Sequence, residues 1–125
     1  MKSARELNMY REKKIESVAN NMMKKAWEYL GEKVNEEMKK EFTEFFENQS
    51  IKINKEEMDS RMEKVLIWGN FPRFADTTRR KAKRLLEDNL RDRGWELKLV
   101  EVSVEKNDEE KTEKYWALCP LPDEK

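Results

Sequence analysis

The sequence contains no histidine and only one cysteine, Cys119. A serine or cysteine nucleophile therefore has no histidine to act as its base, and metal centres built from histidine and cysteine have too few ligands. A single cysteine also excludes an internal disulfide framework and is compatible with a reducing compartment. Its thiol lies in an apolar stretch, where cysteine is usually inert. We therefore expect a protein that is not an enzyme, with no catalytic residues, no metal site and no cofactor.

Glycine and proline are also scarce, with three residues of each. The glycines stand singly at positions 31, 69 and 94, so the chain has no glycine-rich loop that could hold a phosphate group. No internal repeat or low-complexity linker divides the chain. The sequence predicts a single domain over residues 1–122, with a helical arm at 1–33, a core at 34–122 and a tail at 123–125.

Long apolar runs are absent as well. No stretch approaches the roughly 20 apolar residues of a membrane-spanning helix, and the charged N-terminal residues precede no apolar segment of a secretory signal. We expect no membrane partner and no small-molecule substrate. The expected location is the cytoplasm, either of a cell or of an infected host.

The net charge is zero, because 27 basic side chains balance 27 acidic ones. No overall field therefore attracts nucleic acid or an anionic membrane. Residues 1–71 carry 14 side chains of each sign, whereas residues 72–94 carry eight basic and four acidic ones, and residues 95–125 carry five basic and nine acidic ones. A basic segment is thus followed by an acidic one.

Apolar residues recur at steps of three and four between residues 15 and 30, which is typical of an amphipathic helix. Met23 and Trp27 lie four residues apart on the flank of this stripe. They either widen the face that packs into the core or form a landing site for a protein partner.

Gly31 interrupts the helical pattern, which resumes between residues 34 and 46. Glycine is unfavourable inside a helix and common just after a helix ends. The segment 3–47 is therefore predicted to be either two helices that meet near Gly31, the second over about 34–47, or one long bent helix.

The second half predicts a regular order of short elements. Asn54 is expected to be the N-cap of a helix, and Asp76 or Thr77 that of the next, which Gly94 closes. From residue 95 the apolar period changes to two, with a shift at Leu99 that indicates either a bulge or a strand buried on both faces. The predicted elements are a strand at 51–53, helices at 55–68 and 76–93, and hairpin strands at 96–104 and 114–119 joined by a polar loop at 105–113.

These elements predict an α+β fold that is mainly helical, with three to four amphipathic helices and a C-terminal antiparallel β-hairpin. Their order is similar to that of a winged-helix domain. The resemblance implies that the short strand pairs with the hairpin and that the helix at 76–93 is the one presented to DNA. The N-terminal helix would then be an additional packing or dimerisation arm.

A basic cluster in the helix at 76–93 is the main functional signal. Five of the six residues from Arg79 to Arg84 are cationic and lie in the first half of the helix. Cations there are mildly destabilising, because the N-terminus carries the positive pole of the helix dipole. A negatively charged partner is therefore expected, with the Thr77 and Thr78 hydroxyls as further donors. The predicted nucleic-acid-binding residues are Arg73, Arg79, Arg80, Lys81, Lys83, Arg84 and Arg91.

Two other interpretations remain open for these charges. The cations could form ordinary ion pairs four residues apart, as in Lys83 with Glu87 and Arg84 with Asp88. The acidic loop of the hairpin would also repel phosphate if it lay beside the basic helix. The alternative is therefore a protein-interaction module, an adaptor or inhibitor of viral or mobile-element type, which could also form a homodimer through its N-terminal helix. Its predicted contact residues are Met23, Trp27, Glu109 and Glu110.

Overall fold

The computed structural model describes residues 1–41, 44–69 and 74–122. It has four helices and three strands in these parts of the chain. The elements are α1 (Ala4–Lys39), α2 (Glu44–Asn48), β1 (Ile51–Ile53), α3 (Lys55–Gly69), α4 (Ala75–Asp92), β2 (Trp95–Lys106) and β3 (Glu109–Pro120). The predicted α+β class, mainly helical with a C-terminal antiparallel hairpin, is confirmed, and so is the order of elements.

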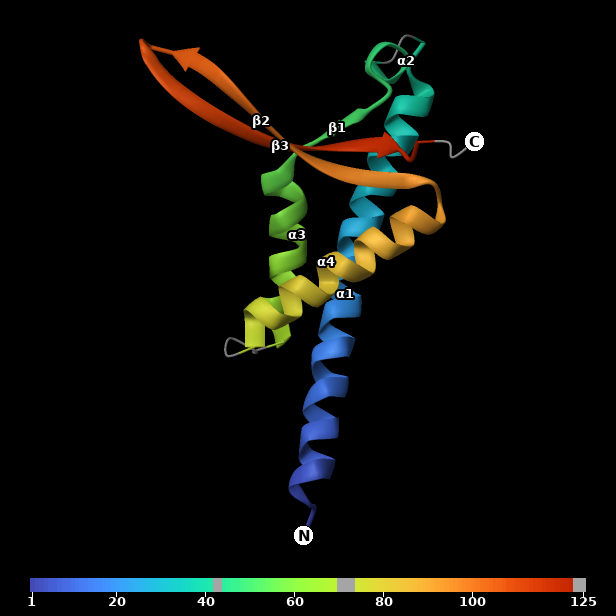
Figure 1. The fold of residues 1–125 in the computed structure, drawn as a ribbon, viewed down its shortest axis with the longest axis vertical. Helices are drawn as coiled ribbons and strands as arrows, with labels where there is room; N and C mark the ends of the chain where they lie inside the picture. Colours follow the sequence, from blue (N-terminus) through green and yellow to red (C-terminus); the bar gives the residue numbers. More distant parts are fainter. Residues whose placement is uncertain (42–43, 70–73, 123–125) are drawn as a thin grey trace.

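Helix α1 is the axis of the molecule, at a length of about 54 Å for its 36 residues (Figure 1). Ser3 is its N-cap, with a hydroxyl oxygen that accepts a hydrogen bond from the Glu6 N–H at 3.2 Å. The helix passes through Gly31 without a break, so two helices do not meet there, and the alternative of one long helix over 3–47 is correct only as far as Lys39. The boundary expected at residue 33 falls inside α1.

The prediction of one continuous helix over about 34–47 is wrong, although residues 34–39 and 44–47 are helical. Helix α1 ends at Lys39, and α2 is a separate short helix. The apolar residues continue at helical spacing beyond Lys39. Near the end of α1, however, Met38 is 78% exposed, so the last turn of the helix does not pack against the core. Phe45 of α2 instead meets Trp95 edge to face, with ring centroids 6.1 Å apart.

Helix α3 begins as the sequence predicts. The Asn54 side-chain oxygen accepts a hydrogen bond from the Glu57 N–H at 3.1 Å, which satisfies one amide of the first turn. Helix α4, in contrast, starts one residue earlier than expected. Its N-cap is Phe74, without a side-chain hydrogen bond, so the prediction of Asp76 or Thr77 as the cap is wrong. The hydroxyl of buried Thr78 donates to the Phe74 carbonyl oxygen at 2.7 Å instead.

The sheet has the strand order β1-β3-β2 and is antiparallel throughout. Strand β1 pairs with the end of β3, from Ile51 opposite Leu118 to Ile53 opposite Trp116, as the winged-helix-like order implies. The register between β2 and β3 is continuous, so the apolar shift near Leu99 is not a bulge. The strand instead has apolar residues on both faces.

The predicted polar loop at 105–113 is largely strand. Strands β2 and β3 extend to Lys106 and from Glu109, and only Asn107 and Asp108 form the turn. Both turn residues have positive φ, at 53° and 62°. This is the conformation of a two-residue hairpin turn, which asparagine and aspartate tolerate better than most residues. The charged composition suggested a loop because it shows solvent exposure rather than backbone pairing.

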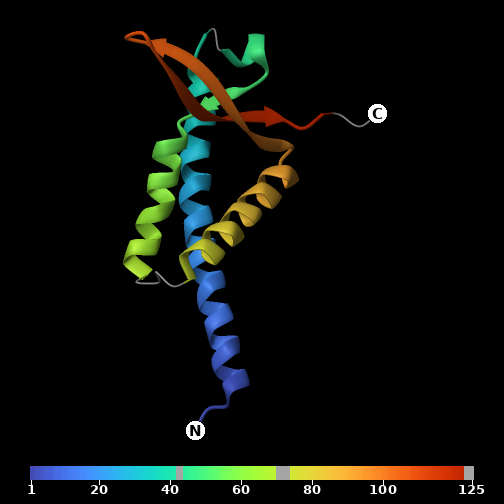
Figure 2. The same cartoon turned by 60° about the vertical axis from the view of Figure 1, so that its left-hand side comes forward.

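The core lies where α3, α4 and the sheet meet α1 (Figure 2). Apolar residues of α1 from Val18 to Leu30 pack with Met58 and Met62 of α3, and with Leu86 of α4. Both α3 and α4 pack against α1 far more than against each other within the described residues. The first three turns of α1 extend beyond this core, and every described residue before Ile15 is exposed.

Candidate functional site

Helix α4 divides cleanly into a buried and an exposed face. Thr78, Ala82, Leu86 and Leu90 recur every four residues and are all buried. At 100° per residue, Arg80, Arg84 and Arg91 lie on the side opposite this stripe, and all three are exposed. The apolar stripe therefore fixes the helix on α1 and directs these three arginines toward solvent. Thr78 is on the buried side, so its expected role as a phosphate donor is wrong.

Arg79 has a different environment from its neighbours. Its guanidinium spans two helices, with Nη2 donating to Glu63 Oε2 of α3 at 2.8 Å and Nη1 donating to Asp76 Oδ1 at 2.8 Å. The side-chain hydrogen bonds and negative charge of Glu63, with a smaller effect of Asp76, raise the pKa of Arg79. Arg79 therefore links α4 to α3, and its charge is compensated within the protein.

The other cations of the cluster are not compensated in this way. Among the described residues, Arg80, Lys81, Lys83, Arg84 and Arg91 form no ion pair. The alternative pairs Lys83–Glu87 and Arg84–Asp88 are thus not formed. Lys83 places its ammonium group 4.9 Å from the centre of the Trp116 ring. The first half of α4 therefore presents a basic surface in which Arg80 and Arg84 are exposed and form no ion pair with any described residue.

The exposed start of α1 is a second basic segment, which from here on we call the arm (residues 1–14, shorter than the helical arm predicted at 1–33). It carries five basic and two acidic side chains. The Arg11 guanidinium carbon lies 5.4 Å from the centre of the Phe74 ring, just before α4. The base of the arm therefore meets the basic start of α4. The excess of basic over acidic side chains in residues 1–14 is present in the sequence, but residues 15–71 carry the opposite excess and cancel it. The basic residues of the arm are Lys2, Arg5, Arg11, Lys13 and Lys14.

The acidic turn of the hairpin does not border this basic surface. Figures 1 and 2 place the turn at the end of the molecule opposite the arm, while α4 starts beside the arm. Glu109 and Glu110 are exposed at the start of β3. The charge separation along the sequence is therefore also a separation along the long axis of the molecule. The repulsion of phosphate that would follow if this turn lay beside the basic helix does not arise at the start of α4, although Trp116 in the paired part of the hairpin contacts Lys83.

Met23 and Trp27 are both partly buried against the core. The Asn89 amide of α4 donates a hydrogen bond to Met23 Sδ at 3.8 Å, and the Arg93 guanidinium carbon lies 5.6 Å from the centre of the Trp27 ring. The flank of the α1 stripe is therefore in contact with α4 and the residue that follows it. Arg73 lies outside the described residues.

Cys119, the single cysteine, is partly buried in β3. Burial raises the pKa of the Cys119 thiol, which favours its unreactive protonated form. Within residues 1–41, 44–69 and 74–122, no helix is long and apolar enough to span a membrane. No protein-family model, curated protein or solved structure matches the chain.

Proposed function

We propose that this protein is a small binding protein without catalytic activity that engages nucleic acid through the outer face of α4 and the arm. One observation carries the proposal: Arg80 and Arg84 in the first half of α4 are exposed and form no ion pair in the described residues, although Asp76 and Asp88 lie four positions away. When Lys and Arg side chains neutralise the phosphates of a nucleic acid, the counterions bound to those phosphates are released. This release makes binding favourable. The position of these two arginines against the helix dipole is otherwise unfavourable.

The same residues indicate how the contact would be made. Arg80 and Arg84 are one helical turn apart on the exposed face, and Lys81 and Lys83 flank them. Such a row is suited to successive phosphates of one strand, with the arm reaching further along the backbone. The acidic hairpin supports this orientation, because it would keep the opposite end of the molecule away from the polyanion.

Titration of a labelled DNA duplex by fluorescence anisotropy tests this function. The affinity should fall steeply between about 50 and 200 mM salt, and the Arg80→Ala/Arg84→Ala variant should have a log–log salt slope that is shallower by about two. Its stability should be unchanged, because both side chains are exposed.

The control variant Lys106→Ala/Lys111→Ala removes the same charge from the opposite end and should bind like the wild type. Equal binding by the Arg80→Ala/Arg84→Ala variant, or binding without salt dependence, would contradict the proposal.

A protein-interaction module is the second candidate, and the hairpin supports it. Strand β2 lies at the edge of the sheet, and its Leu99 and Val102 side chains are 46% and 39% exposed. An edge strand with exposed apolar residues can pair with a strand of a partner. On the arm, Leu7 and Tyr10 are 65% and 63% exposed, which supports a homodimer through α1 as its form.

A further inference from the structure

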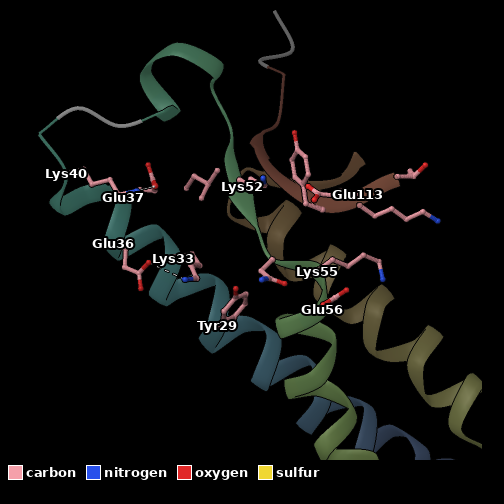
Figure 3. A pocket seen from close by; sticks show the side chains of 14 residues that line it. Tyr29, Lys33, Glu36, Glu37, Lys40, Lys52, Lys55, Glu56 and Glu113 are labelled. Atoms are coloured by element: carbon pink, nitrogen blue, oxygen red, sulfur yellow. Dashed lines mark hydrogen bonds and ion pairs between the residues drawn. The ribbon is translucent and has the colours of Figure 1, made fainter. Parts of the chain in front are cut away.

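A cleft of about 770 Å³ lies at the end of the molecule that is remote from the arm (Figure 3). Its walls are the last turns of α1, strand β1 with the first turn of α3, and the middle of β3. These three segments are far apart in the sequence, so no sequence pattern could identify the cleft. Its volume is in the range of small-molecule binding sites.

Tyr29 is the buried polar residue of this cleft. Its side chain is 1% exposed, and its hydroxyl group has no hydrogen-bond partner among the described residues. The ring is held in place by two cations, with Lys33 Nζ 5.4 Å and the Arg61 guanidinium carbon 4.6 Å from its centre. Figure 3 shows the hydroxyl directed from α1 into the space between α1 and the start of α3. A buried hydroxyl in this position is a donor available to a ligand.

The first turn of α3 supplies further donors to the same cleft. Asn54, Lys55 and Glu56 all line it. The first amides of a helix have no carbonyl partner within the helix, and here Asn54 takes up only that of Glu57. These amides and the positive end of the helix dipole favour an anion. Tyr29 is an independent second observation, because it comes from another helix.

The charged side chains of the cleft leave one cation available. On α1, Glu36 is paired with Lys33 at 3.3 Å and Glu37 with Lys40 at 2.8 Å. Glu113 of β3 is paired with Lys106 at 3.7 Å, and Glu56 is exposed on the first turn of α3. Lys52 has no ion pair among the described residues, and its Nζ lies 4.8 Å from the centre of the Tyr115 ring. Its ammonium group is therefore the cation of the cleft that is not already paired with a described carboxylate, while Glu56 is the lining carboxylate without an ion pair among the described residues.

We propose that this cleft binds the phosphate group of a small molecule. The Tyr29 hydroxyl and the first amides of α3 donate hydrogen bonds to the phosphate oxygens, and Lys52 balances the charge. The site is separate from the basic face of α4, so it does not depend on the function proposed above. It departs from the expectation drawn from the sequence, which was that the protein has no small-molecule substrate.

The experiment is a titration of the ¹⁵N-labelled protein with inorganic phosphate and with pyrophosphate at constant ionic strength. We expect saturable shifts of the Lys55 and Glu56 amides. Tyr29→Phe should weaken binding at least tenfold, whereas its ligand-free melting temperature should be unchanged or higher, because the variant removes an unpartnered hydroxyl. Lys52→Gln should also weaken binding.

Tyr10→Phe is the matched control, since Tyr10 is exposed on the arm and should leave phosphate binding unchanged. Arg80→Ala/Arg84→Ala should leave it unchanged as well, which separates this site from the nucleic-acid surface. The proposal is overturned by the absence of saturable shifts, by shifts centred on α4, or by equal binding of Tyr29→Phe. A lower melting temperature of ligand-free Tyr29→Phe also overturns it, because the hydroxyl would then serve folding.

Discussion

Gly31 and Gly94 are the same amino acid in opposite conformational settings. Gly31 lies inside α1, where a Cβ atom would meet nothing within 4 Å. Gly94 follows α4 with φ at 81°, in the left-handed region that side chains disfavour. The sequence predicted that Gly94 ends a helix, and it left open whether a helix ends at Gly31 or continues through it. The helix ends only at Gly94. It continues through Gly31, where Tyr29 and Leu30 before the glycine and Val34 after it all pack against the same core.

This difference predicts opposite effects of alanine on stability. Gly31→Ala should raise the free energy of unfolding by about 0.5–1 kcal/mol, because alanine has the better helix propensity and causes no clash. Gly94→Ala should lower it by about 1 kcal/mol, the cost of a left-handed residue with a side chain. Urea denaturation of the two variants measures both values. A loss of stability in Gly31→Ala would contradict the conformation described for α1.

Neighbouring residues of α4 show the limit of prediction at the residue scale. Arg79 and Arg80 are adjacent and chemically identical, and the sequence placed both in one basic site. The structure pairs Arg79 with Glu63, sixteen residues earlier in the chain, and leaves Arg80 exposed. Helical spacing shows which residues share a face, but it does not show which acidic residue of another helix lies beside that face.

The hairpin shows how one turn determines an element. Only two residues separate β2 from β3, which sets the register of the two strands, and they pair over twelve residues each. Asn107 and Asp108 take up positive φ values that most residues avoid. The charged residues around the turn are exposed members of the strands. Their polarity made them resemble a loop in the sequence, since exposure and irregular backbone have the same compositional signature.

The turn predicts a graded response at Asp108. Asp108→Gly should stabilise the hairpin by about 0.5 kcal/mol, because glycine adopts positive φ without steric cost, and Asp108→Val should destabilise it by about 1 kcal/mol. Amide hydrogen exchange in β2 and β3 near the turn reports this local stability. Equal protection in the two variants would show that the turn does not require positive φ.

At the scale of the whole molecule, the charges form two opposite poles. The arm and the first half of α4 are basic at one end, and the hairpin turn is acidic at the other. The net charge of zero hides this arrangement entirely. A protein of zero net charge can therefore present a basic surface. Only the charges within about one Debye length act on a docked partner.

Deletion of residues 1–9 tests the arm as a unit. The deleted segment is exposed throughout and contributes nothing to the core, so the free energy of unfolding should change by no more than about 0.5 kcal/mol. Affinity for the duplex should fall, because Lys2 and Arg5 are removed.

The molar mass of the full-length protein and of the variant without residues 1–9, measured by light scattering, tests the second candidate function. A dimer that becomes monomeric on deletion would favour the protein-interaction module through α1, whereas a monomer in both cases would count against it.

The sequence by itself determined helices α3 and α4, the short strand β1, the hairpin and their order. These follow from local causes: apolar periods of 3.6 and two, the Asn54 cap, and Gly94 with positive φ. The apolar stripe between residues 15 and 30 of α1 was correctly expected to face a core. Local patterns also indicated a basic face on α4, because residues spaced by one helical turn must lie together.

Only the tertiary structure decided what each of these elements meets. It ended α1 at Lys39, turned Arg79 toward α3, and brought Tyr29 into the same cleft as the start of α3. The separation of the acidic hairpin from the basic half of α4 is also a property of the packed molecule. Contacts between distant segments depend on how α1 orients its neighbours, and that orientation is set by the shared core rather than by any one segment.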